Sequence, residues 1–323
     1  QLINRAAGDF QGIREATILS ILLVVVVSVA LLLQKAILKS GSYDIIKGKS
    51  MRPTVIKLRS AKIPLLIISI VTLVIIVVVP LGMIFLVGLL KSYGLPLVPS
   101  NFDFSNYTNI LFNNKMVRDG VSNSLILAVS SGIFAMLLGV MIAYVIIKIK
   151  PKGKGALEFL ATLPYSLPGT VLAIGVILAW SGKILNINLY NTLWIIFIAY
   201  IARYLSFSMN AASAALRQVH PSLEEASRSC GASHTESLKD ITLPLIRPAM
   251  LSGFFLIFLP AMRELTTSSL LYGPYTRTLG VAIYMLRSDG YITQASALAT
   301  LTILLIVVVN WIINFITKER KGV

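Results

Sequence analysis

Seven long apolar stretches, separated by polar segments, dominate the pattern of hydrophobic and polar positions along this chain. They lie at residues 17–38, 63–90, 121–147, 156–181, 191–213, 249–271 and 295–317. Each is long enough for the ~20 residues that an α-helix needs to cross a bilayer core. The pattern therefore predicts an all-α membrane protein. Within 156–181, Pro164 and Pro168 each remove a backbone donor, so we expect that helix to be kinked or broken.

Basic residues gather in the loops on one side of these predicted spans. Lysine and arginine are concentrated in segment 39–62, in segment 148–155 and in the C-terminal tail. The opposite loops, 92–120, 182–190 and 272–294, are balanced in charge or poor in basic residues. Because cytoplasmic loops of membrane proteins carry an excess of lysine and arginine, we expect segment 214–248 and the C-terminus to be cytoplasmic. The same bias accounts for the net charge of +16 without any nucleic-acid partner.

The composition indicates an integral membrane protein with several spans. Hydrophobic residues make up 56% of the chain and charged residues only 13%. One cysteine, Cys230, and two scattered histidines offer neither an internal disulfide nor metal-ligand spacing, so we expect no metal site and no cofactor. The letters KGKS at 47–50 lack the first glycine of a phosphate-binding loop, because Tyr43 stands there. No nucleophile–base pair or carboxylate dyad is recognisable either, so the chain is not expected to hydrolyse ATP itself.

The first apolar stretch resembles the last one. The letters ATILSILLVVVV at 16–27 are similar to LATLTILLIVVV at 298–309, and both stretches end in basic residues. One interpretation is that residues 1–38 form the last transmembrane helix of an upstream permease copy, joined by a basic linker at 39–62 to a six-span domain at 63–323. The alternative is that two spans rich in leucine and valine look alike by composition.

A small polar segment, 224–244, separates two of the most apolar parts of the chain. Ser222 with Glu225, and Ser233 with Glu236, fit the S-x-x-E pattern of a capping box at a helix start. Gly231 between them can adopt the left-handed conformation that ends a helix. The segment therefore predicts a short helix, a glycine corner and a second short helix that stops at Pro244.

The spacing of this segment resembles the E-A-A, three residues, G, nine residues, I-x-L-P motif of the membrane subunits of binding-protein-dependent ABC importers. The matching residues are Glu225, Ala226, Ser227, Gly231, Ile241, Leu243 and Pro244. Ser227 departs from the family's alanine, but it is also small. The resemblance covers roughly the six-span part of the chain. It implies a six-helix type I ABC importer permease core, here preceded by one extra transmembrane helix.

The resemblance also implies partners and a location. Members of this family lie in the inner membrane of prokaryotic cells. Their loop at this position, 214–248 here, docks on a cytoplasmic ABC ATPase dimer and passes its movement to the membrane helices. A solute-binding protein outside the membrane delivers the cargo, and a second permease copy, fused or homodimeric, completes the path. The competing hypothesis is an ion-coupled secondary transporter that needs no ATPase.

Three charged residues, Arg203, Arg263 and Glu264, fall inside predicted spans, where ionisable groups are costly and face a cavity or a partner. A Glu264–Arg203 pair could hold two helices together, or the three residues could line a translocation path. The letters RELTTSSLLYGP at 263–274 resemble ferric-iron-type permeases. That resemblance implies ferric iron as the cargo, with thiamine, sulfate, polyamine and phosphonate importers as related alternatives.

Overall fold

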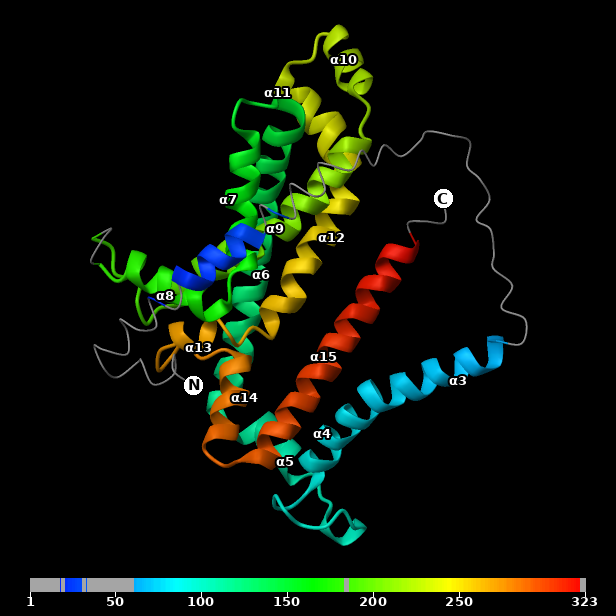
Figure 1. Ribbon diagram of the computed structural model, residues 1–323, viewed down its shortest axis with the longest axis vertical. Coiled ribbons are helices and arrows are strands. Elements are labelled where there is room, and N and C mark those ends of the chain that lie inside the picture. The colour runs from blue at the N-terminus through cyan, green and yellow to red at the C-terminus, as the bar shows by residue number, and fades with distance from the viewer. Residues whose placement is uncertain (1–17, 19–20, 31–32, 34–60, 183–185, 320–323) are drawn as a thin grey trace. The chain divides into compact units, whose positions relative to one another are not determined.

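The computed structural model describes residues 18, 21–30, 33, 61–182 and 186–319, and the regular structure of these residues is helical, with no β-strand (Figure 1). Helices long and apolar enough to cross a membrane are Lys62–Leu89, Lys115–Ile149, Leu193–Gln218, His234–Met262 and Ile292–Ile313. A bent pair, Lys154–Ser166 with Gly169–Trp180, makes a sixth if it is one span. The prediction of an all-α membrane fold is confirmed in this part of the chain.

The N-terminal predictions fall largely outside the described residues. Of the predicted extra span at 17–38, the structure describes mainly a short apolar helix at Ile21–Ala30. The proposed linker at 39–62 is described only at its last two residues. The boundary between an upstream fragment and a six-span domain therefore stays a prediction.

Contacts divide the chain into two compact units. The first contains Asn114–Met285, with N-terminal residues up to Ser28. The second combines Val29–Asn113 with Leu286–Val323. The predicted polar segment and all three predicted membrane charges therefore lie in the first unit.

Three helices form the centre of the first unit: α6 (Lys115–Tyr144), α9 (Leu193–Gln218) and α12 (Leu243–Met262). Small residues let them approach closely, as is common where helices pack within membranes. A Cβ on Gly139 of α6 would lie 2.1 Å from the Ser208 hydroxyl oxygen of α9, and one on Gly132 would lie 2.8 Å from the Phe254 ring of α12. The Ser208 hydroxyl donates a 2.7 Å hydrogen bond to the Ala135 carbonyl of α6. Close backbone approach thus fixes this three-helix core.

The proline-rich stretch breaks its helix as predicted. Helix α7 (Lys154–Ser166) contains Pro164 and packs on α9, whereas α8 (Gly169–Trp180) begins directly after Pro168 and bends away by 112°. Gly169 faces Thr266 so closely that a Cβ would lie 2.2 Å from the threonine hydroxyl. The break therefore sits against the segment that follows α12.

The span predicted at 249–271 is misplaced toward the C-terminus. The helix runs from His234 to Met262, through a wider π-helical turn at Leu238–Thr242 that leads directly into α12. Pro244 does not end the helix: it lies just after the wider turn, near the start of α12, and the chain continues helical through it. After Met262 the chain makes short helices, α13 (Ser268–Leu271) and α14 (Leu279–Ser288).

The second unit contains α3 (Lys62–Leu73), α4 (Val79–Leu89), α5 (Ser105–Thr108) and α15 (Ile292–Glu319). Gly88 lets α4 pack on α15, because a Cβ there would lie 3.1 Å from the Ala297 Cα. Buried Asn106 donates to the carbonyls of Gly88 at 3.1 Å and Leu90 at 2.8 Å, and accepts from the Thr293 hydroxyl at 3.3 Å. One side chain thereby ties three segments of this unit together.

Candidate functional site

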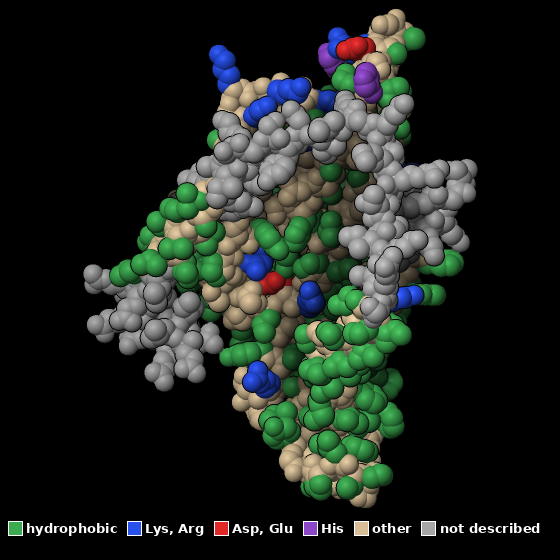
Figure 2. Space-filling model, turned by 45° about the vertical axis from the view of Figure 1, so that its right-hand side comes forward, with side chains coloured by type: hydrophobic (Ala, Val, Ile, Leu, Met, Phe, Trp, Pro, Cys, Tyr) green, Lys and Arg blue, Asp and Glu red, His purple; other side chains and the backbone are tan. Residues whose placement is uncertain are grey.

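The polar segment forms a helical hairpin as predicted. Helix α10 (Pro221–Ser229) ends near Gly231, whose φ of +97° makes the corner, and α11 (His234–Ser237) follows. Acidic and histidine side chains gather where α10 and α11 lie, whereas hydrophobic side chains cover much of the described helices on the face drawn (Figure 2). The hairpin is therefore a polar projection from an apolar helical body.

The two predicted capping boxes have different outcomes. At α11 the box is present: the Ser233 N–H donates to the Glu236 carboxylate at 2.7 Å, and the Glu236 N–H donates to the Ser233 hydroxyl at 3.3 Å. At α10 the prediction is wrong, because Pro221 starts the helix earlier and His220 is the cap, accepting from the Ser222 N–H at 3.3 Å.

The predicted motif residues differ in how far they are exposed. Glu225 and Ala226 are exposed on α10, and Ser227 is half-buried. Ile241 and Leu243 are half-buried in the returning helix, where Pro244 is exposed. The hairpin therefore exposes the acidic residue and the alanine of the motif, whereas the isoleucine and leucine are partly buried.

Sequence reasoning missed a neighbouring residue of the motif, Glu224. Its Oε1 accepts from the Thr242 hydroxyl at 2.7 Å and pairs with the Lys148 ammonium at 3.0 Å. Burial alone would raise the pKa of Glu224, but these two donors outweigh it, so the pKa lies below its ordinary value and the carboxylate stays charged at neutral pH. Adjacent residues on a helix point about 100° apart, so Glu224 and Glu225 face different directions. This spacing was the sequence signal that one of the two could contact the neighbouring helices.

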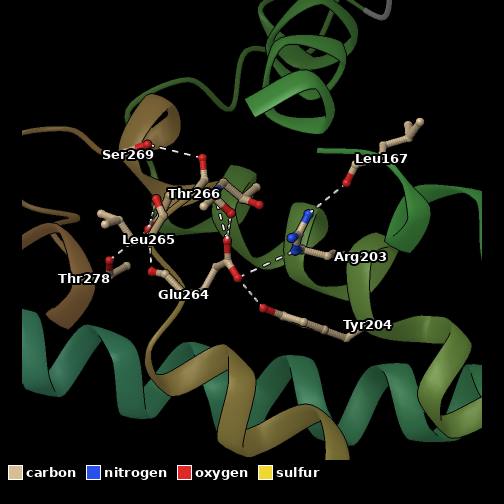
Figure 3. A network of polar contacts seen from close by, with 10 residues as sticks. Leu167, Arg203, Tyr204, Glu264, Leu265, Thr266, Ser269 and Thr278 are labelled. Atoms are coloured by element: carbon tan, nitrogen blue, oxygen red, sulfur yellow. Dashed lines mark hydrogen bonds and ion pairs between the residues drawn. The ribbon is translucent and has the colours of Figure 1, made fainter. Parts of the chain in front are cut away.

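A second polar cluster surrounds Glu264 (Figure 3). Its Oε1 accepts from the Thr266 hydroxyl at 2.6 Å and from the Thr267 N–H at 2.9 Å. Its Oε2 accepts from the Tyr204 hydroxyl and lies 3.6 Å from Nε of Arg203. The buried carboxylate is thus surrounded by donors on both oxygens, which is the condition for keeping a charge in an apolar interior.

Arg203 joins this cluster to the broken helix. While its Nε faces Glu264, its Nη1 donates to the Leu167 carbonyl at 3.4 Å. Leu167 lies at the break between α7 and α8, where a carbonyl is freed from helical bonding. The predicted Glu264–Arg203 pair is therefore present, and it also stabilises the break.

Arg263 and Glu264 lie just beyond α12 and not inside a helix, because α12 ends at Met262. The two side chains separate: Glu264 is buried and Arg263 is exposed. Sequence reasoning missed Tyr204, Thr266 and Thr267, since a tyrosine in an apolar stretch and threonines in a loop carry no local signal of pairing. Within the described residues, no group of three or more histidine, cysteine or acidic side chains could hold a metal ion.

Comparisons with known proteins agree with this architecture. The family described as "binding-protein-dependent transport system inner membrane component" matches residues 135–321. A Salmonella typhimurium protein described as a 2-aminoethylphosphonate transport system permease is 30% identical over 219 residues, which cover 68% of this chain and 81% of that protein. A ferric transport system permease of Actinobacillus pleuropneumoniae is 30% identical over 322 residues, covering 97% of this chain and 46% of that protein.

The fold is also found in a solved structure. A chain of a bacterial alginate ABC transporter, crystallised with its alginate-bound periplasmic protein, superposes with a TM-score of 0.65 at 18% identity, covering 80% of this chain and 94% of that chain. Together with the membrane-spanning helices and the family match, this shared fold leads to one conclusion: the chain belongs to the binding-protein-dependent transport system inner membrane component family and is a multi-pass inner-membrane permease of an ABC importer.

Proposed function

We propose that this permease moves ferric iron from an extracytoplasmic solute-binding protein into the cytoplasm by alternating access. The energy comes from a separate cytoplasmic ABC ATPase dimer that docks on α10 and the Gly231 corner. The observation that supports this docking site is the exposure of Glu225 and Ala226 on a helix whose cap is supplied by another residue. Glu225 is therefore available for a basic group of the ATPase.

The hairpin has the rigidity that such a role needs. A moving partner can drive helices only through an element that resists bending. His220 fixes the start of α10, the Ser233–Glu236 box fixes the start of α11, and α11 continues through the wider turn into α12. A push on the corner is thus passed along a continuous helix into the membrane.

Co-purification with the partner ATPase tests this proposal. Glu225→Arg and Gly231→Ala are expected to reduce ATPase binding to the full-length permease. Gly153→Ala is the matched control, because Gly153 has a φ of +92° and Gly231 one of +97°, and an added Cβ meets nothing within 4 Å at either position. Unchanged ATPase binding and transport in both hairpin variants would instead favour an ion-coupled transporter.

We further propose that Arg203, Arg263 and Glu264 lie along the translocation path. Ionisable groups at membrane depth typically mark such paths. The exposed Arg263 contacts the moving solute or its carrier, whereas the buried Arg203–Glu264 pair holds the α7–α8 break beside it. Arg263→Gln should then slow transport with little change in stability.

The cargo assignment is supported by the ferric transport permease, whose alignment runs along almost the whole of this chain. A phosphonate cargo is the alternative, because the 2-aminoethylphosphonate permease relative is equally identical over a shorter stretch. Proteoliposomes containing the permease, a second permease copy, the ATPase and the solute-binding protein should accumulate ferric iron in an ATP-dependent manner. Accumulation of 2-aminoethylphosphonate and not of iron would replace the ferric assignment.

A further inference from the structure

Glu224 bonds together three segments that meet at the base of the hairpin. The carboxylate, in the first turn of α10, accepts from the Thr242 hydroxyl in the turn that leads into α12. It also pairs with Lys148, in the π-helical turn Val145–Ile149 that continues α6. The Lys148 ammonium also lies 3.5 Å from the Val219 carbonyl, where α9 ends. We define Lys148, Glu224 and Thr242 as the clamp.

The clamp gives α10 a link that the chain itself does not provide. Chain connections join α10 directly to α9 on one side and to the helix of α11 and α12 on the other. Helix α6 is separated from α10 in sequence by α7, α8 and α9. The Lys148–Glu224 ion pair fastens the start of α10 to α6.

Helix α6 leads from the clamp to a different part of the first unit. Its helical span runs over Lys115–Ile149. Near its other end, the Asn123 side chain donates to the carbonyls of Tyr275 and Arg277, at 3.1 and 2.9 Å, and the Leu279 N–H donates to the Ser124 hydroxyl at 2.7 Å. At 1.5 Å per residue, these bonds lie about 37 Å from Lys148 along the helix.

We propose that Glu224 is a positioning residue that fastens α10 to α6, so that α6 carries ATPase-driven movement of α10 to the loop around Tyr275. This inference rests on the proposed docking of the ATPase on α10. It adds a second route to the covalent one through α12, and it assigns to Glu224 a role distinct from that of the exposed Glu225.

The clamp could also stabilise the fold, and a measurement of thermal stability separates the two roles. The side chains of Lys148 and Glu224 are 13% and 20% exposed, so the ion pair is only partly in contact with water. Removing one partner of such a pair carries a cost in stability, because the remaining charge loses its counter-ion. The core beneath the clamp consists of packed apolar residues from α6, α7, α9 and α12. Loss of the clamp should therefore impair coupling while the protein still folds.

The test follows movement at Tyr275, whose exposed fraction is 88%. A fluorescent amino acid replaces Tyr275 by codon suppression in the full chain, assembled with its ATPase in lipid nanodiscs. The signal is the fluorescence change when ATP and vanadate are added, and ATPase binding and thermal stability are measured in the same samples. The variants are Glu224→Ala, Lys148→Met, Thr242→Val and the charge exchange Lys148→Glu with Glu224→Lys; Lys152→Met, an exposed lysine in the following loop, is the control.

We expect Glu224→Ala and Lys148→Met to remove most of the fluorescence change, because the ion pair that fastens α10 to α6 is then absent. ATPase binding should stay within about two-fold of that of the unmodified chain, and the charge exchange should recover part of the signal. Thr242→Val should give a smaller loss. This milder change remains informative if a charge variant folds poorly.

Two results would overturn the inference. One is an unchanged fluorescence response in folded clamp variants that still bind the ATPase. The other is a loss of ATPase binding in those variants, which would make Glu224 part of the docking surface. If the unmodified chain binds no ATPase through α10, the proposed function fails, and that outcome is distinguishable because it appears before any clamp residue is changed.

Discussion

Two adjacent carboxylates show how residue-scale geometry separates roles that look identical in the sequence. Glu224 points toward the body and is held by Thr242 and Lys148, whereas Glu225 is exposed. The same separation occurs at Arg263 and Glu264, where one charged side chain is exposed and its neighbour is buried among donors. At this scale, the direction of each side chain decides which partner it meets.

At the residue scale we predict that Glu264→Ala destabilises the permease. The change leaves Arg203 with an uncompensated charge and removes the acceptor for Tyr204 and Thr267, so the free energy of unfolding should fall by about 3 kcal/mol. Unfolding titrations in mixed micelles measure this. Asp289→Ala, a change of an exposed acid, should shift it by less than about 0.5 kcal/mol.

The double variant Arg203→Met with Glu264→Leu provides the internal check. It removes both charges, so its loss in free energy of unfolding should be smaller than the sum of the losses caused by Arg203→Met alone and Glu264→Leu alone. Additive losses would show that the two residues do not act on each other, contrary to their 3.6 Å separation.

At the scale of the elements, glycine and serine decide how close the central helices come. The α6–α9 contact depends on Gly139, because the Ser208 hydroxyl and the Met209 backbone nitrogen occupy the space where a Cβ would project. A π-helical turn also sets the length of one element, since the turn at Leu238–Thr242 allows α11 to continue into α12 past Pro244. Local departures from regular α-helix thus determine how long the helices are and how closely they pack.

For the elements we predict opposite effects of two glycine-to-alanine changes. Gly139→Ala forces α6 away from α9 and should cost about 1–3 kcal/mol. Gly175→Ala in α8 meets nothing within 4 Å and should be neutral or stabilise by up to about 1 kcal/mol, because glycine loses more backbone freedom on folding. Thermal unfolding of the two purified variants compares them directly, and equal losses would contradict the close approach at Gly139.

At the scale of the whole molecule, the order of the helices fixes which loops share a side of the membrane. The bent pair of α7 and α8 matters here, because counting it as one span places the hairpin of α10 and α11 on the same side as the α6–α7 connection. That connection carries Lys150, Lys152 and Lys154. The excess of lysine on that side favours a cytoplasmic hairpin and a cytoplasmic C-terminus.

For the whole molecule we predict that Cys230 is labelled only from the cytoplasmic side. This cysteine is exposed at the hairpin corner and is the one cysteine in the sequence, so it reports on that loop without other changes. A membrane-impermeant maleimide should modify it in inside-out vesicles and not in spheroplasts. Tyr275→Cys, placed on the predicted outer side in a Cys230→Ser chain, should behave in the opposite way, and labelling of both cysteines from one side would refute the topology.

The sequence by itself determined the features that depend on local composition. Apolar stretches predicted the membrane helices, because the bilayer core demands that length of apolar chain. Pro164 and Pro168 predicted the α7–α8 break, and Gly231 predicted the hairpin corner, because these residue types restrict or extend the backbone wherever they occur. The motif spacing around Glu225 predicted the family that the comparisons confirm.

Only the tertiary structure decided the features that depend on contacts between distant segments. Two local choices also differ from the prediction: His220 caps α10, and the span predicted at 249–271 is misplaced, because a π-helical turn accommodates Pro244 and Glu264 forms a turn with Thr266 and Thr267. The remaining contacts join separate helices, since the Glu224 clamp needs Lys148 beyond α6 and the Glu264 cluster needs Tyr204 from α9. Folding alone brings these donors and acceptors together, and no local pattern encodes those partners.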